Sequence, residues 1–79
     1  MKVTVTVRRL PNISDPQGTT VARALRDLGH EVAKVRVDKL ITLEIEGDDP
    51  DAVRAQAEEM CEKLLANPVM EEYEISFQP

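Results

Sequence analysis

The sequence has few of the residues that small domains use to staple their folds or build reactive sites. Its 79 residues include one cysteine, Cys61, and one histidine, His30. An internal disulfide is therefore impossible, and a Cys/His zinc cluster is not expected. A domain of this length buries only about 60% of the surface that its unfolded chain exposes. We therefore expect the chain to gain stability from other subunits.

Aromatic residues and positive charge are also scarce. The chain has one Tyr, one Phe and no Trp, and its net charge is −5. Residues 1–40 carry eight Lys or Arg against four Asp or Glu, whereas residues 41–79 carry two against eleven. Such a chain lacks the basic patch and stacking platform of a nucleic-acid binder. It has no apolar run typical of a signal peptide or a membrane span, and a lone thiol fits a reducing compartment. We expect a cytoplasmic protein that binds neither nucleic acid nor membrane.

Hydrophobic periodicity predicts the elements of the fold. Val3, Val5 and Val7 alternate with polar residues, as in a half-buried strand. Val21 and Leu28 share a helical stripe that ends before Gly29, a residue suited to a left-handed helix terminus. In chain order we predict a strand over 2–8, a helix over 16–28, hairpin strands over 31–38 and 39–47, a helix from 50 and a strand over 71–77.

This β-α-β-β-α-β order predicts an α+β fold related to the ferredoxin-like folds, formed as a single domain over residues 1–79. Four antiparallel strands would form one sheet, with both helices on one face. The predicted core residues are Val3, Val5, Val7, Val21, Leu25, Leu28, Val37, Ile41, Leu43, Ile45, Val53, Ala57, Met60, Leu64 and Ile75.

The other sheet face is expected to be rich in threonine and internally neutralised, with Arg8 near Glu44, Glu46 and Glu74. It is either a solvated face or a surface that packs on another subunit. The candidate residues for a homodimer interface are Thr4, Thr6, Thr42, Tyr73, Ile75 and Phe77.

The sequence shows no residues that would let this chain catalyse a reaction by itself. A nucleophile needs a positioned base, and His30, which follows a helix-ending glycine, is interpreted as a surface loop residue. Cys61 falls on an apolar helical stripe and is interpreted as a packed, inert thiol. Three separated glycines form no phosphate loop. We therefore predict no catalytic residue, no bound cofactor and no metal site on this chain.

The stretch "ISDPQG" precedes the first predicted helix. Asp15 suits the N-cap and Pro16 the first helical turn. Gly18 is unexplained by capping, because glycine inside a helix costs roughly 0.8–1.0 kcal/mol against alanine. Either the regular helix starts later or another backbone comes close. We predict a rigid corner that docks a partner subunit through Asp15, Pro16, Gln17 and Gly18, with a second contact at Asn67 and Pro68.

Three stretches carry a family resemblance: "SDPQG", "KVRVDKLITLEI" and "EMCEKLLANPVMEEYEI". Together they make the chain similar to the PurS family, small subunits of phosphoribosylformylglycinamidine synthase. That family commonly has glycine where this chain has Asn12, and asparagine also tolerates a left-handed backbone.

The resemblance implies a non-catalytic, dimeric subunit in purine biosynthesis. Such subunits assemble with a synthetase and a glutaminase, and they are thought to bridge the two and support ammonia transfer. ATP, Mg and glutamine would be used by those partners. The alternative is a ferredoxin-like regulatory domain that senses an amino acid. That function favours a Gly-rich loop after the first strand, of which "LPNISDPQG" is a poor version.

Overall fold

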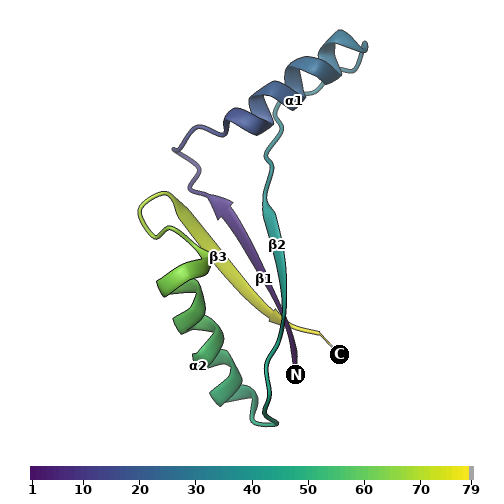
Figure 1. Cartoon of the computed structure of the whole chain (residues 1–79). Helices are drawn as coiled ribbons and strands as arrows, with labels where there is room; N and C mark the ends of the chain where they lie inside the picture. The colour runs from purple at the N-terminus through teal and green to yellow at the C-terminus, as the bar shows by residue number, and fades with distance from the viewer. Residues whose placement is uncertain (79) are drawn as a thin grey trace.

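Residues 1–78 form one antiparallel sheet, two α-helices and a π-helical turn. Figure 1 shows how the sheet and the helices are arranged. The computed structural model describes residues 1–78. In the sheet the strand order is β2-β1-β3, so β1 is central and pairs with both neighbours. The predicted four-stranded sheet is therefore wrong, since the described residues form three strands. The elements are β1 (Lys2–Arg9), α1 (Pro16–Asp27), β2 (Lys39–Glu44), α2 (Pro50–Met60), η1 (Cys61–Leu65) and β3 (Glu71–Phe77).

The segment over residues 31–38 is not the predicted strand. The predicted hairpin turn at Asp38–Lys39 does not form, and the chain continues in one direction from this segment into β2 (Figure 1). Apart from the exposed Leu40, its apolar residues from Val35 to Ile45 have odd numbers, which is the parity of one unbroken extended segment. No glycine turn interrupts it. Only the part from Lys39 onward reaches β1, whose Val7 pairs with Lys39.

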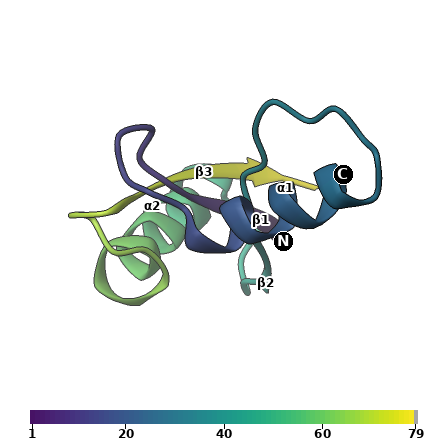
Figure 2. The ribbon, with the colours of Figure 1, turned by 90° about the horizontal axis from the view of Figure 1, so that it is seen from above.

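The two helices lie in different places, which corrects the prediction that both cover one sheet face. α2 runs beside β3 and β1, whereas α1 extends beyond the end of the sheet (Figure 1). After α1 the chain arches back over the helix toward β2 (Figure 2). The chain measures 49 × 28 × 14 Å, with a radius of gyration of 15.8 Å. A compact domain of this length would have about 12 Å, so the projecting α1 accounts for an elongated molecule.

The buried core lies between the sheet and α2. Because directly paired residues share a face, Val3, Val5 and Val7 point to the same side as their partners in β2 and β3. The buried apolar residues are Val3, Val5, Val7, Ala22, Ile45, Val53, Ala57, Cys61 and Ala66. Five residues of the predicted core are exposed instead: Val21, Leu28, Val37, Met60 and Leu64.

The π-helical turn explains the most exposed of these, Leu64, which is 83% exposed. In η1 the N–H of Ala66 donates to the carbonyl of Cys61, five residues earlier, at 2.9 Å. Such a turn contains one more residue than an α-helical turn. The inward position predicted for Leu64 from helical spacing therefore passes to Leu65, which packs against the core.

Candidate functional site

The first candidate site is the start of α1, where Asp15 caps the helix as predicted. One carboxylate oxygen accepts from the Gly18 N–H at 3.1 Å. The other accepts from the Val37 N–H at 2.7 Å, across to the segment that returns from α1. These two backbone donors, Val37 first, lower the pKa of Asp15 below its usual range, and Arg36 and Arg9 act in the same direction. We call residues 13–18 together with 35–37 the helix-start corner.

Gly18 has helical backbone geometry within this corner. Glycine fits at this position because another part of the same chain comes very close to it. A Cβ at this position would overlap the carbonyl oxygen of Val35 and lie 2.9 Å from its carbonyl carbon. The backbone of Val35 thus passes directly over Gly18, which is buried. Of the two explanations left open by the sequence, close approach of a backbone is correct. The docking role of Asp15, Pro16, Gln17 and Gly18 stays a prediction.

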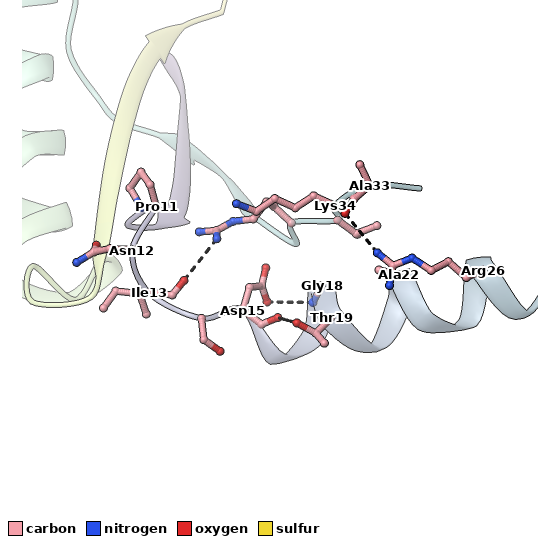
Figure 3. A pocket seen from close by; sticks show the side chains of 13 residues that line it. Pro11, Asn12, Ile13, Asp15, Gly18, Thr19, Ala22, Arg26, Ala33 and Lys34 are labelled. Atoms are coloured by element: carbon pink, nitrogen blue, oxygen red, sulfur yellow. Dashed lines mark hydrogen bonds between the residues drawn. The ribbon is translucent and has the colours of Figure 1, made fainter. Parts of the chain in front are cut away.

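Two arginines fix the geometry of the corner. Arg36 donates to the carbonyls of Arg9, Leu10 and Ile13, at distances from 2.9 to 3.4 Å. Arg26, in the last turn of α1, donates to the carbonyls of Val32 and Ala33. The side chains surround a hollow of about 390 Å³ (Figure 3). The Arg26 guanidinium thus ties the returning segment to α1, and the Arg36 guanidinium ties the same segment to the end of β1 and the loop that follows it.

The second docking candidate, Asn67 and Pro68, lies at the same end of the sheet as the corner. Both residues are exposed in the turn before β3. The Asn67 side chain accepts from the Val69 N–H, and its carbonyl accepts from the Glu71 N–H at 2.7 Å. A hydrogen bond from the Leu10 N–H to the Met70 carbonyl joins this turn to the one that follows β1. The two predicted contact points therefore share one end of the molecule.

The candidate dimer-interface residues divide between the two faces of the sheet. Thr4, Thr6 and Thr42 lie on the face away from α2, because Thr4 pairs with Thr42. Tyr73, Ile75 and Phe77 pair with Val7, Val5 and Val3 and therefore face α2. The six candidates therefore lie on opposite faces of the sheet, and their role in a dimer interface stays a prediction.

The threonine face is internally neutralised, broadly as expected. Arg8 lies 3.2 Å from Glu74 and 4.0 Å from Asp38. Glu44 pairs instead with Lys2, at 3.9 Å. These charged side chains are partly or largely exposed, so each pair contributes little to stability.

Two further side chains that could take part in chemistry, Cys61 and Tyr73, pack in or against the hydrophobic core. Cys61 is buried against Val5 and Val7, and burial, followed by Glu58 and Glu62, raises the pKa of its thiol. Burial and Glu62 likewise raise the pKa of Tyr73, whose hydroxyl donates to Glu62 at 3.4 Å. Neither group is poised to ionise near neutral pH.

Among residues 1–78, no three or more acidic, cysteine or histidine residues are grouped so that they could hold a metal ion. In the same part of the chain no helix has the length and apolarity needed to cross a membrane. Every buried side-chain polar atom in this region has a hydrogen-bond partner. The helix-start corner, with its side chains hydrogen-bonded to the backbone, is therefore the leading candidate site.

Sequence reasoning missed the role of Arg36 and Val35. Arg36 falls in the strand predicted over 31–38, whereas its side chain bonds to the carbonyls of Arg9 and Leu10, where β1 ends. The odd numbering of every apolar residue from Val35 to Ile45 except Leu40 was the available signal, because it indicates an extended segment with no reversal.

Comparison with known proteins identifies the family. The PurS family, described as phosphoribosylformylglycinamidine (FGAM) synthase, matches residues 2–79. The PurS subunit from Methanocaldococcus jannaschii is 41% identical over 78 residues, which cover 98% of this chain and 94% of that protein. The PurS subunit from Bacillus subtilis is 45% identical over 73 residues, covering 91% and 86%.

Solved structures agree with the sequence matches. The crystal structure of the M. jannaschii PurS superposes with a TM-score of 0.87 at 41% identity, covering 95% of this chain and 92% of that one. A chain in the structure of PurLQS from Thermotoga maritima gives 0.87 at 39% identity, covering 95% and 93%. With family, sequence and fold in agreement over nearly its whole length, the chain belongs to the PurS family.

Proposed function

We propose that this chain is a non-catalytic small subunit of phosphoribosylformylglycinamidine synthase in purine biosynthesis. In this role it bridges the ATP-dependent synthetase and the glutaminase and supports ammonia transfer between them. The observation that carries the proposal is the match to a chain of PurLQS, with a TM-score of 0.87 over 95% of this chain. The subunit acts in the cytoplasm as one domain over residues 1–79, and its partners use the ATP, Mg and glutamine.

The chemistry of the helix-start corner supports a bridging role. Its charged groups bond to the chain's own backbone: Asp15 to two N–H groups and Arg36 to three carbonyls. Such bonds fix the shape of a surface, and a surface fixed before binding loses less conformational freedom on association. A rigid corner therefore suits a subunit that orients two enzymes.

The docking surface for one of these partners is the end of the sheet that carries both predicted contact points. Pro16 and Gln17 lie exposed at the start of α1, and Asn67 and Pro68 lie exposed in the turn before β3. The Leu10–Met70 hydrogen bond holds the two turns together. A single partner surface can therefore contact both.

The amino-acid-sensing alternative is not favoured. A ligand in the loop after β1 would need free backbone groups there. The side chain of Arg36 already donates hydrogen bonds to the carbonyls of Leu10 and Ile13 in that loop.

Reconstitution with the synthetase and glutaminase of the same organism tests the function. Turnover of formylglycinamide ribonucleotide is measured once with glutamine and once with ammonium chloride. We expect omission of this chain to abolish most glutamine-dependent turnover, while the ammonia-dependent reaction is better retained. Equal glutamine-dependent rates with and without the chain would contradict the proposed function.

The docking surface is tested with Pro16→Arg and Pro68→Arg, since each adds a bulky charge at an exposed position. Asp48→Arg serves as the matched control, because Asp48 is an exposed residue of the loop between β2 and α2. That loop lies at the opposite end of the sheet (Figure 1). We expect partner binding to weaken about tenfold, equivalent to roughly 1.4 kcal/mol, for the first two variants only. Equal binding by all three would reject this surface and leave the subunit role intact.

A further inference from the structure

More positive than negative charge surrounds the hollow of about 390 Å³ at the helix-start corner. Its charged lining residues are Arg26, Lys34, Arg36 and Asp15, and three cations against one acid give a formal charge of +2. This excess is unexpected, because the whole chain has fifteen acids and only ten Lys or Arg. The cations also come from two elements, Arg26 from α1 and Lys34 from the returning segment (Figure 3).

Lys34 differs from the other three lysines of the chain. Each of those lies 2.7 to 3.9 Å from a carboxylate oxygen: Lys2, Lys39 and Lys63. Lys34 is exposed, and it forms neither an ion pair nor a side-chain hydrogen bond within residues 1–78. Because like charges that share one hollow repel each other, an anion from outside the chain would relieve the repulsion between Lys34 and Arg36.

The two arginines keep hydrogen-bond donors in reserve. A guanidinium has five N–H groups, and Arg36 makes three recorded bonds and Arg26 two, so half of their N–H groups have no partner in the part of the chain that the structure describes. The carbonyls of Ile13 and Ala33, which line the hollow, already accept from these arginines. The carboxylate of Asp15 already accepts two backbone N–H groups. The hollow therefore offers donors rather than acceptors.

We propose that the hollow binds the phosphate group of a small molecule, with the Lys34 ammonium and the Arg36 guanidinium as its ligands. The two residues are two positions apart on an extended segment, so their side chains leave it on the same side. Both group types bind phosphate in proteins, arginine as a planar fork and lysine as a point charge. A dianionic phosphate balances the formal charge of +2, whereas one carboxylate does not.

The rest of the ligand would lie toward α1, where Arg26 lines the hollow. The volume lies within the range of about 300–1,000 Å³ that is usual for small-molecule sites. The site does not rely on the N-terminus of α1, because Asp15 already accepts from the Gly18 N–H at 3.1 Å. An amino acid would need acceptors for its ammonium group, and those lining the hollow already have partners. This inference does not depend on the function proposed above.

Titration with phosphate tests the site. The whole chain, labelled with ¹⁵N, is titrated with inorganic phosphate, glycerol 3-phosphate or acetate at constant ionic strength. We expect both phosphates to shift the amide resonances of residues 13–19 and 33–36 to saturation. Acetate, which carries a single charge, should bind at least about tenfold more weakly. Tighter binding of glycerol 3-phosphate would identify the ligand as a phosphate ester, and tighter binding of inorganic phosphate would identify it as free phosphate.

Lys34→Gln removes one positive charge and no recorded contact within the chain. It should raise the phosphate dissociation constant at least about tenfold, as loss of one charge-assisted hydrogen bond does, whereas Lys34→Arg should retain binding. Lys63→Gln is the matched control, because Lys63 is an exposed lysine of η1 that does not line the hollow. Both positions are exposed, so circular dichroism should show that all three variants are folded.

Several results would overturn the phosphate site. Equal losses of affinity in Lys34→Gln and Lys63→Gln would mean that phosphate responds only to the net charge of the chain. Unchanged affinity in Lys34→Gln, or amide shifts centred away from the hollow, would place the binding elsewhere. Acetate that binds as tightly as phosphate would remove the selectivity for a dianion, and the absence of any saturable shift would remove the site.

Discussion

The two helices of this chain begin alike and end in different environments. Each has an aspartate cap, Asp15 or Asp49, followed by proline at the first helical position. The α2 stripe is buried against the sheet, whereas the α1 stripe faces outward from the chain. Capping satisfies backbone donors within one turn, so it specifies where a helix starts. It says nothing about which surface the helix covers.

This difference in burial between the two helices indicates how stability is distributed along the chain. Val53 and Ala57 of α2 join the central strand in one buried cluster. α1 buries only Gly18 and Ala22, and does so against the segment that follows it. Loss of the α2 contacts should therefore unfold the chain, whereas loss of the α1 contacts should free one arm.

The largest expected effect comes from a charge placed on the buried side of α2, and the same change on the buried side of α1 is the comparison. Ala57→Asp should destabilise the chain by about 4 kcal/mol or more, because an unpaired carboxylate would replace a fully buried methyl group. Ala22→Asp should cost about 1 kcal/mol, since Ala22 lines the hollow that also holds Arg26 and Arg36. Urea unfolding followed by circular dichroism measures both. Equal losses would show that α1 and α2 belong to one cooperative core.

Gly18→Ala is expected to destabilise the corner by about 1–3 kcal/mol, as overpacking does. Alanine in a helix normally gains roughly 0.8–1.0 kcal/mol over glycine, so the sign itself is diagnostic. The physical reason is the backbone of Val35, which lies where the new methyl group would be. Thr20→Ala, at an exposed position of α1, is the control. A stabilised Gly18→Ala variant would mean that the returning segment moves aside freely.

Acid should weaken the corner selectively. The backbone N–H groups of Val37 and Gly18 lower the pKa of Asp15, so its carboxylate stabilises the folded state above the unfolded pKa of about 3.9. That contribution is lost as the pH falls through the lower pKa of the folded chain. The urea midpoints of wild type and Asp15→Asn should therefore differ at neutral pH and converge in strong acid. A constant difference over the whole range would contradict the assigned cause.

Leu28→Ala and Leu64→Ala sharpen the comparison further. As exposed residues, each should change the stability of the isolated chain by about 0.5 kcal/mol or less. A loss of 2–5 kcal/mol for Leu64→Ala, typical of a fully buried leucine, would contradict the exposed position of Leu64. Any larger effect should appear as a midpoint that depends on chain concentration. Thermal unfolding at two concentrations, at least tenfold apart, separates the two contributions.

A similarly small effect is expected on the threonine face. Arg8→Ala removes the ion pair with Glu74, which is largely exposed, and should cost about 0.2–1 kcal/mol. The difference from wild type should shrink in high salt because exposed charges are screened. A salt-independent loss would point to packing by the arginine stem instead.

Local chemistry allowed several features to be predicted from the sequence. The alternating valines of β1, the aspartate cap at Asp15 and the left-handed Gly29, with φ of 95°, are as expected. The burial of Cys61 followed from helical spacing. Each of these depends on dihedral preferences or on neighbours within a few residues, which the sequence displays directly.

Tertiary structure alone decided the rest. The partner of Gly18 is a carbonyl 17 residues further along the chain, and no local signal identifies which backbone will approach. The π-helical turn at Cys61–Leu65 moved Leu64 outward although helical spacing placed it inside. The side on which α1 lies was set by Arg36 and Asp15, which tie two distant segments together. The sequence by itself determined the starts and periods of the elements, because those depend on short-range sterics and hydrogen bonds. Only the folded chain determined which surfaces meet, because that depends on contacts between residues far apart in sequence.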